Sequence, residues 1–194
     1  MNQMRLITIL LTAAAACAAA PVPAAETLNL PHFRTIELRG GGRILLRHGA
    51  EQRVTIQEGS SAYTEIRVER RKGDERLTVD ACNRNCPRHY NLTIEVVTPD
   101  VQAVSVQGGG SIVAEGGFTH QNDIAAAVEG GGVIDLRAMA VRDVAASVDG
   151  GGRLLVKAEQ SLAAAVSGGG SIRYWGRPDV TTSISGGGSV RAGE

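Results

Sequence analysis

The fold is decided by a segment that occurs three times in close succession. Residues 123–136 read DIAAAVEGGGVIDL, residues 143–156 read DVAASVDGGGRLLV, and residues 161–174 read SLAAAVSGGGSIRY. In each copy, apolar residues alternate with small or polar ones before three glycines and again after them. Alternation with a period of two is typical of a β-strand with one buried face. Each copy therefore predicts a strand, a glycine corner and a second strand.

The glycine triplet occurs six times in the 194 residues and accounts for 18 of the 25 glycines. The last five copies follow one another at intervals of 22, 20, 18 and 18 residues. A repeat of about 20 residues is typical of a solenoid, in which each unit buries its apolar face by stacking on the next. The sequence thus predicts an all-β fold, a parallel β-helix with rungs about 4.8 Å apart. Its corners would begin at Gly40, Gly108, Gly130, Gly150, Gly168 and Gly186.

Glycine suits these corners because it accepts backbone angles that a β-carbon forbids and lets neighbouring rungs approach closely. The alanine runs before the triplets would favour a helix in isolation. Three adjacent glycines, however, would cost a helix about 3 kcal/mol at each interruption, at ~1 kcal/mol per glycine. We therefore interpret the alanines as strand residues that suit a narrow interior.

The first 25 residues have the pattern of a secretory signal peptide. Arg5 provides a positive charge, residues 6–20 are apolar, and small residues lie just before Ala25. This apolar run is shorter than the roughly 20 residues that a transmembrane helix needs, and no later segment is long and apolar enough to span a bilayer. We expect export, with residues 1–25 removed. The less favoured alternative is a lipoprotein that keeps Cys17 as its modified N-terminus.

Removal of the leader leaves two cysteines, Cys82 and Cys86, separated by three residues. In an oxidising compartment, an even pair at such short spacing is typical of a structural disulfide. The alternatives are a redox pair and a metal site completed by His89. Redox motifs usually have two intervening residues, and structural zinc usually has four ligands. The sequence therefore favours the disulfide.

The N-terminal part of the mature chain, residues 26–98, differs from the repeats. Its short alternating segments, separated by glycine-containing turns, predict a β-rich region with antiparallel hairpins. We place a boundary near residue 98 and assign residues 99–194 to the glycine-cornered rungs, with one continuous domain as the expected arrangement. The six predicted strands are residues 34–38, 43–46, 53–56, 65–69, 76–79 and 91–96.

Taken together, these motifs resemble a known family of exported bacterial proteins, the head GIN domain proteins or putative auto-transporter adhesins. The resemblance rests on residues 33–38 with the glycines after them, on residues 92–104 and on the serial glycine motifs. Residues 167–178 are similar to the family's late motif, a short strand followed by a Tyr-x-Gly-x-Pro turn. The resemblance covers roughly residues 33–191. It implies a right-handed single-stranded β-helix in the periplasm or at the cell surface, and it assigns no binding residue.

Stacking the units in register places equivalent residues in columns. The residues before two consecutive triplets are Glu129 and Asp149, so these carboxylates would be neighbours, with Arg153 close in sequence. Such a pair would suit acid chemistry or weak calcium binding. The favoured alternative is a solvated surface column, because two carboxylates on adjacent strands cost only a few tenths of a kcal/mol.

A second column contains Glu115, Arg137, Lys157 and Trp175, and predicts a cross-strand pair between Glu115 and Arg137. Trp175 is the lone tryptophan, and it should point outward if Tyr174 points inward. An exposed aromatic ring can stack on a sugar or seal a protein contact, so Trp175 and Tyr174 are candidate ligand-binding residues. The alternative is that Trp175 covers the last corner.

The remaining polar residues predict no chemistry. Asp123, Asp143 and Asp179 are interpreted as strand-opening residues that serve the preceding turns. The histidines lie far apart, and the triplets lack the Lys-Ser or Lys-Thr of a phosphate-binding loop. We expect no catalytic residue, no cofactor and no metal.

Composition narrows the function. The chain has 20 basic and 20 acidic residues, whereas nucleic-acid binding normally leaves a basic footprint. We predict an exported, non-catalytic protein that acts through surface contacts, an adhesin or envelope-associated protein that binds an unidentified protein or glycan. The alternatives are a carbohydrate-active enzyme on a β-helix scaffold and a purely structural envelope protein.

The last repeat also predicts a contact. Only residues 192–194 follow its second strand in this sequence. A solenoid end without a capping element exposes strand edges, and exposed edges favour pairing with another chain. We therefore expect self-association, or docking of a partner, at the C-terminal rung.

Overall fold

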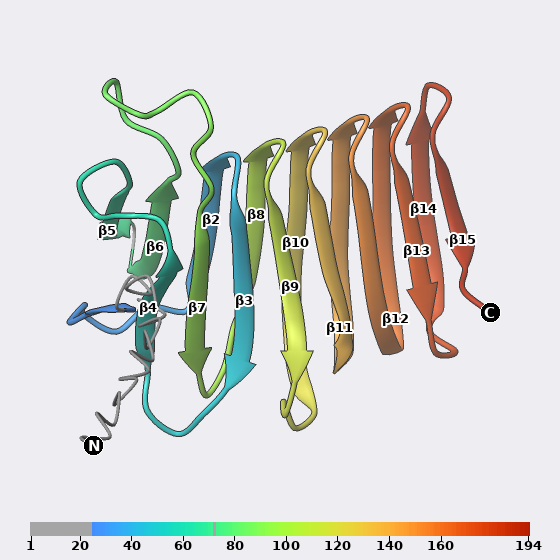
Figure 1. Ribbon diagram of the computed structural model, residues 1–194. Coiled ribbons are helices and arrows are strands. Elements are labelled where there is room, and N and C mark those ends of the chain that lie inside the picture. Colours follow the sequence, from blue (N-terminus) through green and yellow to red (C-terminus); the bar gives the residue numbers. More distant parts are fainter. Residues whose placement is uncertain (1–24, 72) are drawn as a thin grey trace, which may run out of the picture.

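The computed structural model describes residues 25–71 and 73–194, so the expected leader and Cys17 lie outside it. In the part that it describes, all regular structure is β, in one continuous mixed sheet that folds back into two layers (Figure 1). The same part contains no helix with the length and hydrophobicity needed to cross a bilayer. The strands are β1 (Glu26–Leu28), β2 (Thr35–Gly40), β3 (Arg43–His48), β4 (Arg53–Glu58), β5 (Glu65–Arg71), β6 (Asp74–Asp80), β7 (Thr93–Thr98), β8 (Ala103–Gly108), β9 (Ser111–Gly116), β10 (Gln121–Gly130), β11 (Val133–Gly150), β12 (Arg153–Gly168), β13 (Ser171–Trp175), β14 (Asp179–Ser185) and β15 (Ser189–Ala192).

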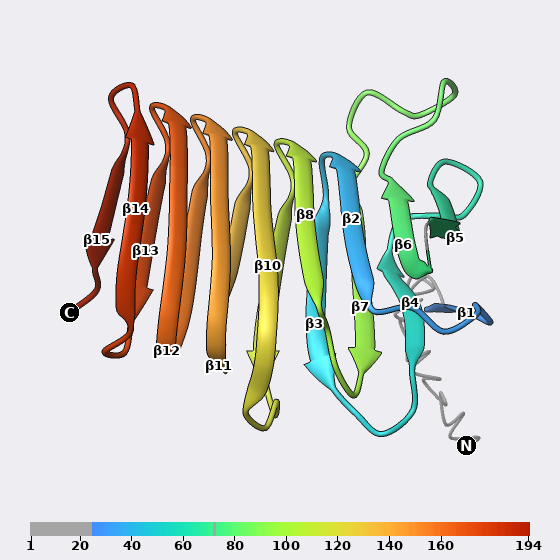
Figure 2. The same cartoon turned by 180° about the vertical axis from the view of Figure 1, so that it is seen from behind.

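Two layers of parallel strands form the C-terminal part of the stack. In the first, the β8 layer, β8, β10, the second halves of β11 and β12, and β14 pair in parallel (Figure 2). In the second, the β9 layer, β9, the first halves of β11 and β12, β13 and β15 pair in parallel. Equivalent residues of successive units are register partners, as Ala125, Ala145 and Ala163 illustrate. The predicted strand, corner and strand of each unit are therefore confirmed.

The N-terminal strands join the same stack. β2 pairs in parallel with β8, where Gly40 is the register partner of Gly108, and β3 pairs in parallel with β9. β6 and β7 extend the two layers, again in parallel. Among the described strands, antiparallel pairing is confined to β1 with β4, β4 with β7, and β5 with β6. The predicted hairpin is thus β5–β6, whereas residues 34–38 and 43–46 belong to the parallel stack.

The core fills the space between the layers. Strands β8, β10, β11 and β12 turn alternate apolar residues inward, so that Val128, Val148 and Val166 stack on one another with almost no exposed surface. Fully burying such a side chain stabilises the fold by about 1.5–3 kcal/mol. One continuous cluster runs from Phe33 to Ile172 and crosses the expected boundary near residue 98. The two parts of the chain share one core.

The glycine corners have a steric explanation that differs within each triplet. Gly150 has a φ of 111°, and a β-carbon there would lie 2.8 Å from the carbonyl oxygen of Gly130. A β-carbon on Gly152 would lie 2.4 Å from Cγ1 of Val128. Gly151 has open space around it, and its N–H donates to the Gly130 carbonyl at 3.0 Å. In the five triplets from Gly108 onward, the first and third glycines are therefore required by stacking, and the second is not.

Candidate functional site

The outward side of the β8 layer is a flat surface of small side chains, which we call the alanine face. It forms because Ile124, Ala126 and Val128 of β10 point inward, so that the residues between them point out, and β11 and β12 repeat the pattern. A shallow hollow of about 610 Å³ lies over it. The alanine face consists of Ala125, Ala127, Ala145, Ser147, Ala163 and Ala165.

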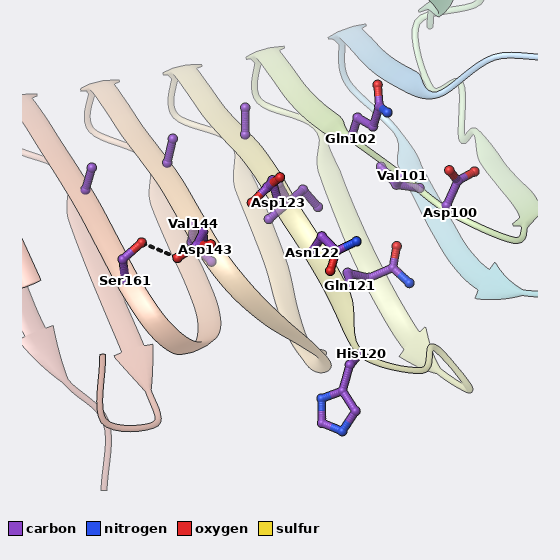
Figure 3. Close-up of a pocket in the computed structure, with 14 residues that line it drawn as sticks. Asp100, Val101, Gln102, His120, Gln121, Asn122, Asp123, Asp143, Val144 and Ser161 are labelled. Atoms are coloured by element: carbon purple, nitrogen blue, oxygen red, sulfur yellow. Dashed lines mark hydrogen bonds between the residues drawn. The ribbon is translucent and has the colours of Figure 1, made fainter. Parts of the chain in front are cut away.

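A polar column borders the alanine face on one side. Asp123, Asp143, Ser161 and Asp179 are consecutive register partners on β10, β11, β12 and β14. Figure 3 shows Asp143 beside Ser161, whose hydroxyl donates to the carboxylate at 2.5 Å, within a hollow of about 670 Å³. Arg142 bridges Asp143, at 2.7 Å, and Asp123, at 3.4 Å. Hydrogen bonds from Ser161 and Arg142 lower the pKa of Asp143, so the carboxylate stays ionised at neutral pH.

This column corrects the interpretation of its aspartates as turn residues. Asp123 and Asp143 lie inside continuous strands, and only Asp179 opens one. Each of them, and Ser161 too, stands seven residues before a triplet. That constant offset is the signal in the sequence from which the column could have been found.

The predicted acid pair borders the alanine face on its other side. Glu129 and Asp149 are register partners, as expected, and both are exposed. Arg153 follows the glycine corner and lies in the β9 layer, so the structure does not bring it to the pair. Nor do the described residues contain any group of three or more side chains that could hold a metal ion. A role for Glu129 and Asp149 in chemistry stays a prediction.

Trp175 is engaged by its own chain. The guanidinium of Arg137 lies over its ring, 5.2 Å from the ring centroid, and Nε1 donates to the Glu194 carbonyl at 3.1 Å. Gly193 lies against the ring edge, where a β-carbon would be 2.1 Å from the nearest ring atom. Tyr174 is half-buried against the core. This geometry favours the covering of the last corner over a free stacking platform, and ligand binding by Trp175 and Tyr174 stays a prediction.

The predicted pair between Glu115 and Arg137 is wrong. Glu115 accepts from Arg47 at 2.5 Å, and Arg137 pairs with Asp135 at 2.7 Å. The pairing of β9 with β11 stops at Asp135, and the register of β11 against β12 shifts just after Leu136. Extra residues at this corner carry Arg137 out of the column in which simple stacking would place it.

The densest cluster of charges lies on the outward side of β2, β5 and β6. Glu37 is 1% exposed and accepts from Arg39 at 2.7 Å and from Arg76 at 2.9 Å. Burial raises the pKa of Glu37, but hydrogen bonds from the two arginines outweigh it, and the pKa lies below its usual value. Arg67 pairs with Asp80 at 2.9 Å in the same cluster. These charges neutralise one another, so they hold strands together.

The cysteine loop between β6 and β7 is closed by the predicted disulfide, Cys82–Cys86. Asn83 within it donates through Nδ2 to the Ala62 carbonyl at 2.8 Å, which ties the loop to the preceding turn. Both sulfur atoms are consumed, whereas a metal site with His89 would need free thiolates. The disulfide prediction is confirmed.

Three solved structures of bacterial proteins are similar to this chain. A putative adhesin from Bacteroides fragilis is 20% identical, with a TM-score of 0.53, over 87% of this chain and 96% of the other. A putative adhesin from Parabacteroides distasonis is 17% identical, with a TM-score of 0.43, over 87% and 96% of the two chains. A putative cell adhesion protein from Clostridium sporogenes is 10% identical, with a TM-score of 0.45, over 88% and 98%. The first likeness shows a shared fold.

Sequence comparison gives the family. No curated protein matches the chain. One family model matches residues 32–125 and 117–178, well over half of the chain, and it is described as "putative auto-transporter adhesin, head GIN domain". The resemblance carried by residues 33–38 and the serial glycine motifs is therefore confirmed, and the chain belongs to the head GIN domain family of putative auto-transporter adhesins.

Proposed function

We propose that this protein is an exported, non-catalytic contact protein of the bacterial envelope, and that it binds a surface partner, protein or glycan, through the alanine face. The observation that carries the proposal is a flat run of exposed small side chains across three strands, bordered by carboxylates on both sides. Contiguous exposed apolar surface marks interaction sites. Alanine loses no rotamer entropy on contact, and it lets a flat partner approach closely.

Adhesion of coated beads tests this function. Beads carrying the protein should adhere to bacterial cells, or to glycans printed on an array, and Ala145→Arg with Ala163→Arg should abolish adhesion. Leu45→Arg is the matched control, because Leu45 lies on the outward side of the opposite layer beside Glu95. Equal adhesion by the Ala145→Arg/Ala163→Arg variant and the unchanged protein would contradict the proposal.

We propose further that the stack is a right-handed single-stranded β-helix. Its support is the parallel pairing of successive units, since crossover connections between parallel strands are right-handed in about 98% of cases.

We also propose that residues 1–25 are removed on export, because their composition is that of a secretory signal peptide. Mass spectrometry of the protein recovered from the periplasm or surface fraction should find a mature N-terminus near Glu26, and an uncleaved chain would contradict export by this route.

A carbohydrate-active enzyme is the second candidate, and one observation favours it. Glu129 and Asp149 are neighbours on adjacent strands at the border of the alanine face. Paired carboxylates perform acid and nucleophile roles in glycoside hydrolysis. If the protein cleaves a polysaccharide, Glu129→Ala with Asp149→Ala should abolish turnover. Unchanged turnover would exclude a catalytic role for the two carboxylates.

Self-association through the last rung is part of the proposal. β14 pairs only with β12 and β15 only with β13 among the described strands, so both present an open edge. Val180 and Ile184 on β14 are exposed, at 37% and 48%. Open edges with exposed apolar residues favour pairing between chains.

A further inference from the structure

Three arginines gather on the outward side of the β9 layer, at its C-terminal end. Arg173 on β13 and Arg191 on β15 are register partners on adjacent strands. Arg153 on β12 is the partner of Ser171, two residues before Arg173. An interstrand spacing of about 4.8 Å brings the three side chains to one place. With Ser171 and Ser189 they line a hollow of about 300 Å³, which we call the arginine pocket.

The arginines of this pocket lack acidic partners among the side chains that the structure describes. Two other arginines of the same layer, Arg47 and Arg137, have acidic partners. Arg47 contacts Glu95 at 3.1 Å and Glu115 at 2.5 Å, and Arg137 contacts Asp135 at 2.7 Å. The acidic residues of this layer are thus occupied by other arginines, and the pocket keeps a net positive charge.

This arrangement works against stability. Like charges directly opposite each other on neighbouring strands destabilise a sheet, and Arg173 and Arg191 are such a pair. A bound anion would remove the repulsion and accept hydrogen bonds from the guanidinium groups and from the hydroxyls of Ser171 and Ser189. The planar fork of arginine matches phosphate, sulfate and carboxylate groups in a bidentate manner. Local charge kept against stability is expected at functional sites.

We propose that the arginine pocket binds the anionic groups of a polysaccharide, with sulfate, phosphate or uronate carboxylate as the group recognised. The inference rests on the proposed contact function, and it adds the chemical class of the partner and a second surface on the layer opposite the alanine face. Arg173 and Arg191 hold the anionic group between adjacent strands, and Arg153 reaches it from the diagonal position. A linear polymer lying along the stack meets the three strands in turn.

The surroundings favour a polysaccharide over an anionic membrane or an acidic peptide. Beyond the pocket, three acids of the same outward face (Glu95, Glu115 and Asp135) pair with only two arginines, so that region offers an extended anionic surface no net attraction. The lining is mainly arginine and serine, without the aromatic anchor that typically dominates protein contacts. A small polar hollow fits a charged sugar substituent.

Binding of dextran sulfate, with unmodified dextran as the neutral match, tests the proposal. The exported protein should bind dextran sulfate and not dextran, and added salt should weaken binding. Arg173→Ser with Arg191→Ser should raise Kd at least about tenfold, because each lost charge-assisted hydrogen bond removes a sizeable part of the affinity. The same variant should melt at an equal or higher temperature, since it removes the like-charge contact. Arg43→Ser, an exposed arginine in register with Ser111 near the other end of this layer, should change Kd less than about twofold.

Three results would overturn the proposal. They are absence of dextran sulfate binding, equal weakening by Arg43→Ser and by the pocket variant, and binding of phosphatidylglycerol vesicles or poly-glutamate without binding of dextran sulfate. The adhesion test separates this inference from the proposed function. Loss of adhesion in the alanine-face variant, with unchanged dextran sulfate binding in the pocket variant, would contradict anion binding by the arginine pocket but support the proposed contact function.

Discussion

The two ends of the stack meet solvent in different ways. At the N-terminal end the chain turns antiparallel, and β5 covers β6 with a network of arginines and acids that includes Arg67 and Asp80. At the C-terminal end, β14 and β15 continue the parallel pattern and have no strand on their outer side among the described residues. Figure 1 shows the two ends at opposite sides of the molecule.

Equivalent positions in one register column differ in burial between the two ends of the stack. Glu37 on β2, Ser105 on β8, Ala127 on β10 and Ser183 on β14 occupy equivalent positions. Glu37 is buried between two arginines, whereas Ser183 is exposed. A parallel stack does not protect its own edge. Charged side chains and an antiparallel strand cover one end, whereas β14 and β15 have no such cover among the described residues, and it is there that we propose pairing between chains.

The largest expected effect is at the charged end. Glu37→Ala should lower the free energy of unfolding by about 3 kcal/mol, because it leaves two arginines without their buried partner. This is the low end for a broken buried pair, since Arg39 and Arg76 are partly exposed and can turn to water. Ser183→Ala, in the same column, is the control and should change stability by less than about 0.5 kcal/mol. Urea denaturation measures the free energy of unfolding of both variants. Equal losses would contradict the claim that the charged cluster stabilises the N-terminal end.

A smaller effect is expected at the corners. Gly150→Ala should destabilise by about 2 kcal/mol, because it places a β-carbon at a positive φ and against the Gly130 carbonyl. Gly186→Ala meets the same obstacle at Gly168 but should cost less, because the last rung can shift. Gly151→Ala, with open space around it, should be neutral. Thermal melts rank the three variants, and a harmless Gly150→Ala would contradict the steric account of the corner.

Acid should weaken the charged end first. The pKa of Glu37 is lower in the folded chain than in the unfolded one, so its stabilisation is complete above the unfolded pKa of about 4.3 and is lost as pH falls through the folded value. Each unit of difference is worth about 1.4 kcal/mol. Denaturation between pH 7 and pH 3 should show a steeper loss for the unchanged protein than for Glu37→Gln. Parallel curves would assign the acid sensitivity to other groups.

The smallest effect on stability is expected at the open end. Ile184→Lys should change the free energy of unfolding by less than about 0.5 kcal/mol, since Ile184 is half exposed. It should nevertheless abolish self-association, because Ile184 continues the inward apolar column of Val166, where a second chain would have to bury the new charge. Ser183→Lys is the matched control, with the same charge on the outward side of the strand. Light scattering at rising concentration distinguishes them, and a strict monomer before any substitution would contradict the proposal.

Much of the fold could be predicted because stacking follows directly from the repeat. The alternation around the triplets at Gly130, Gly150 and Gly168 predicts the strands, the inward faces and the register of Glu129 with Asp149. The column of Asp143 and Ser161 has the same origin and was missed because each aspartate was interpreted alone. The predicted pairing of Arg137 with Glu115 was wrong, because the repeat period of the sequence does not reveal a shift in strand register such as the one in β11.

The sequence by itself determines that the chain is all-β, turns at glycine triplets and has the motifs of the head GIN domain family. Tertiary structure alone decides that Gly40 stacks on Gly108, that Glu37 is buried, and that Arg153, Arg173 and Arg191 share one hollow. The physical reason is the range of the interactions. Backbone angles and two-residue alternation are local, whereas the partner of a charge depends on which strands the fold sets side by side.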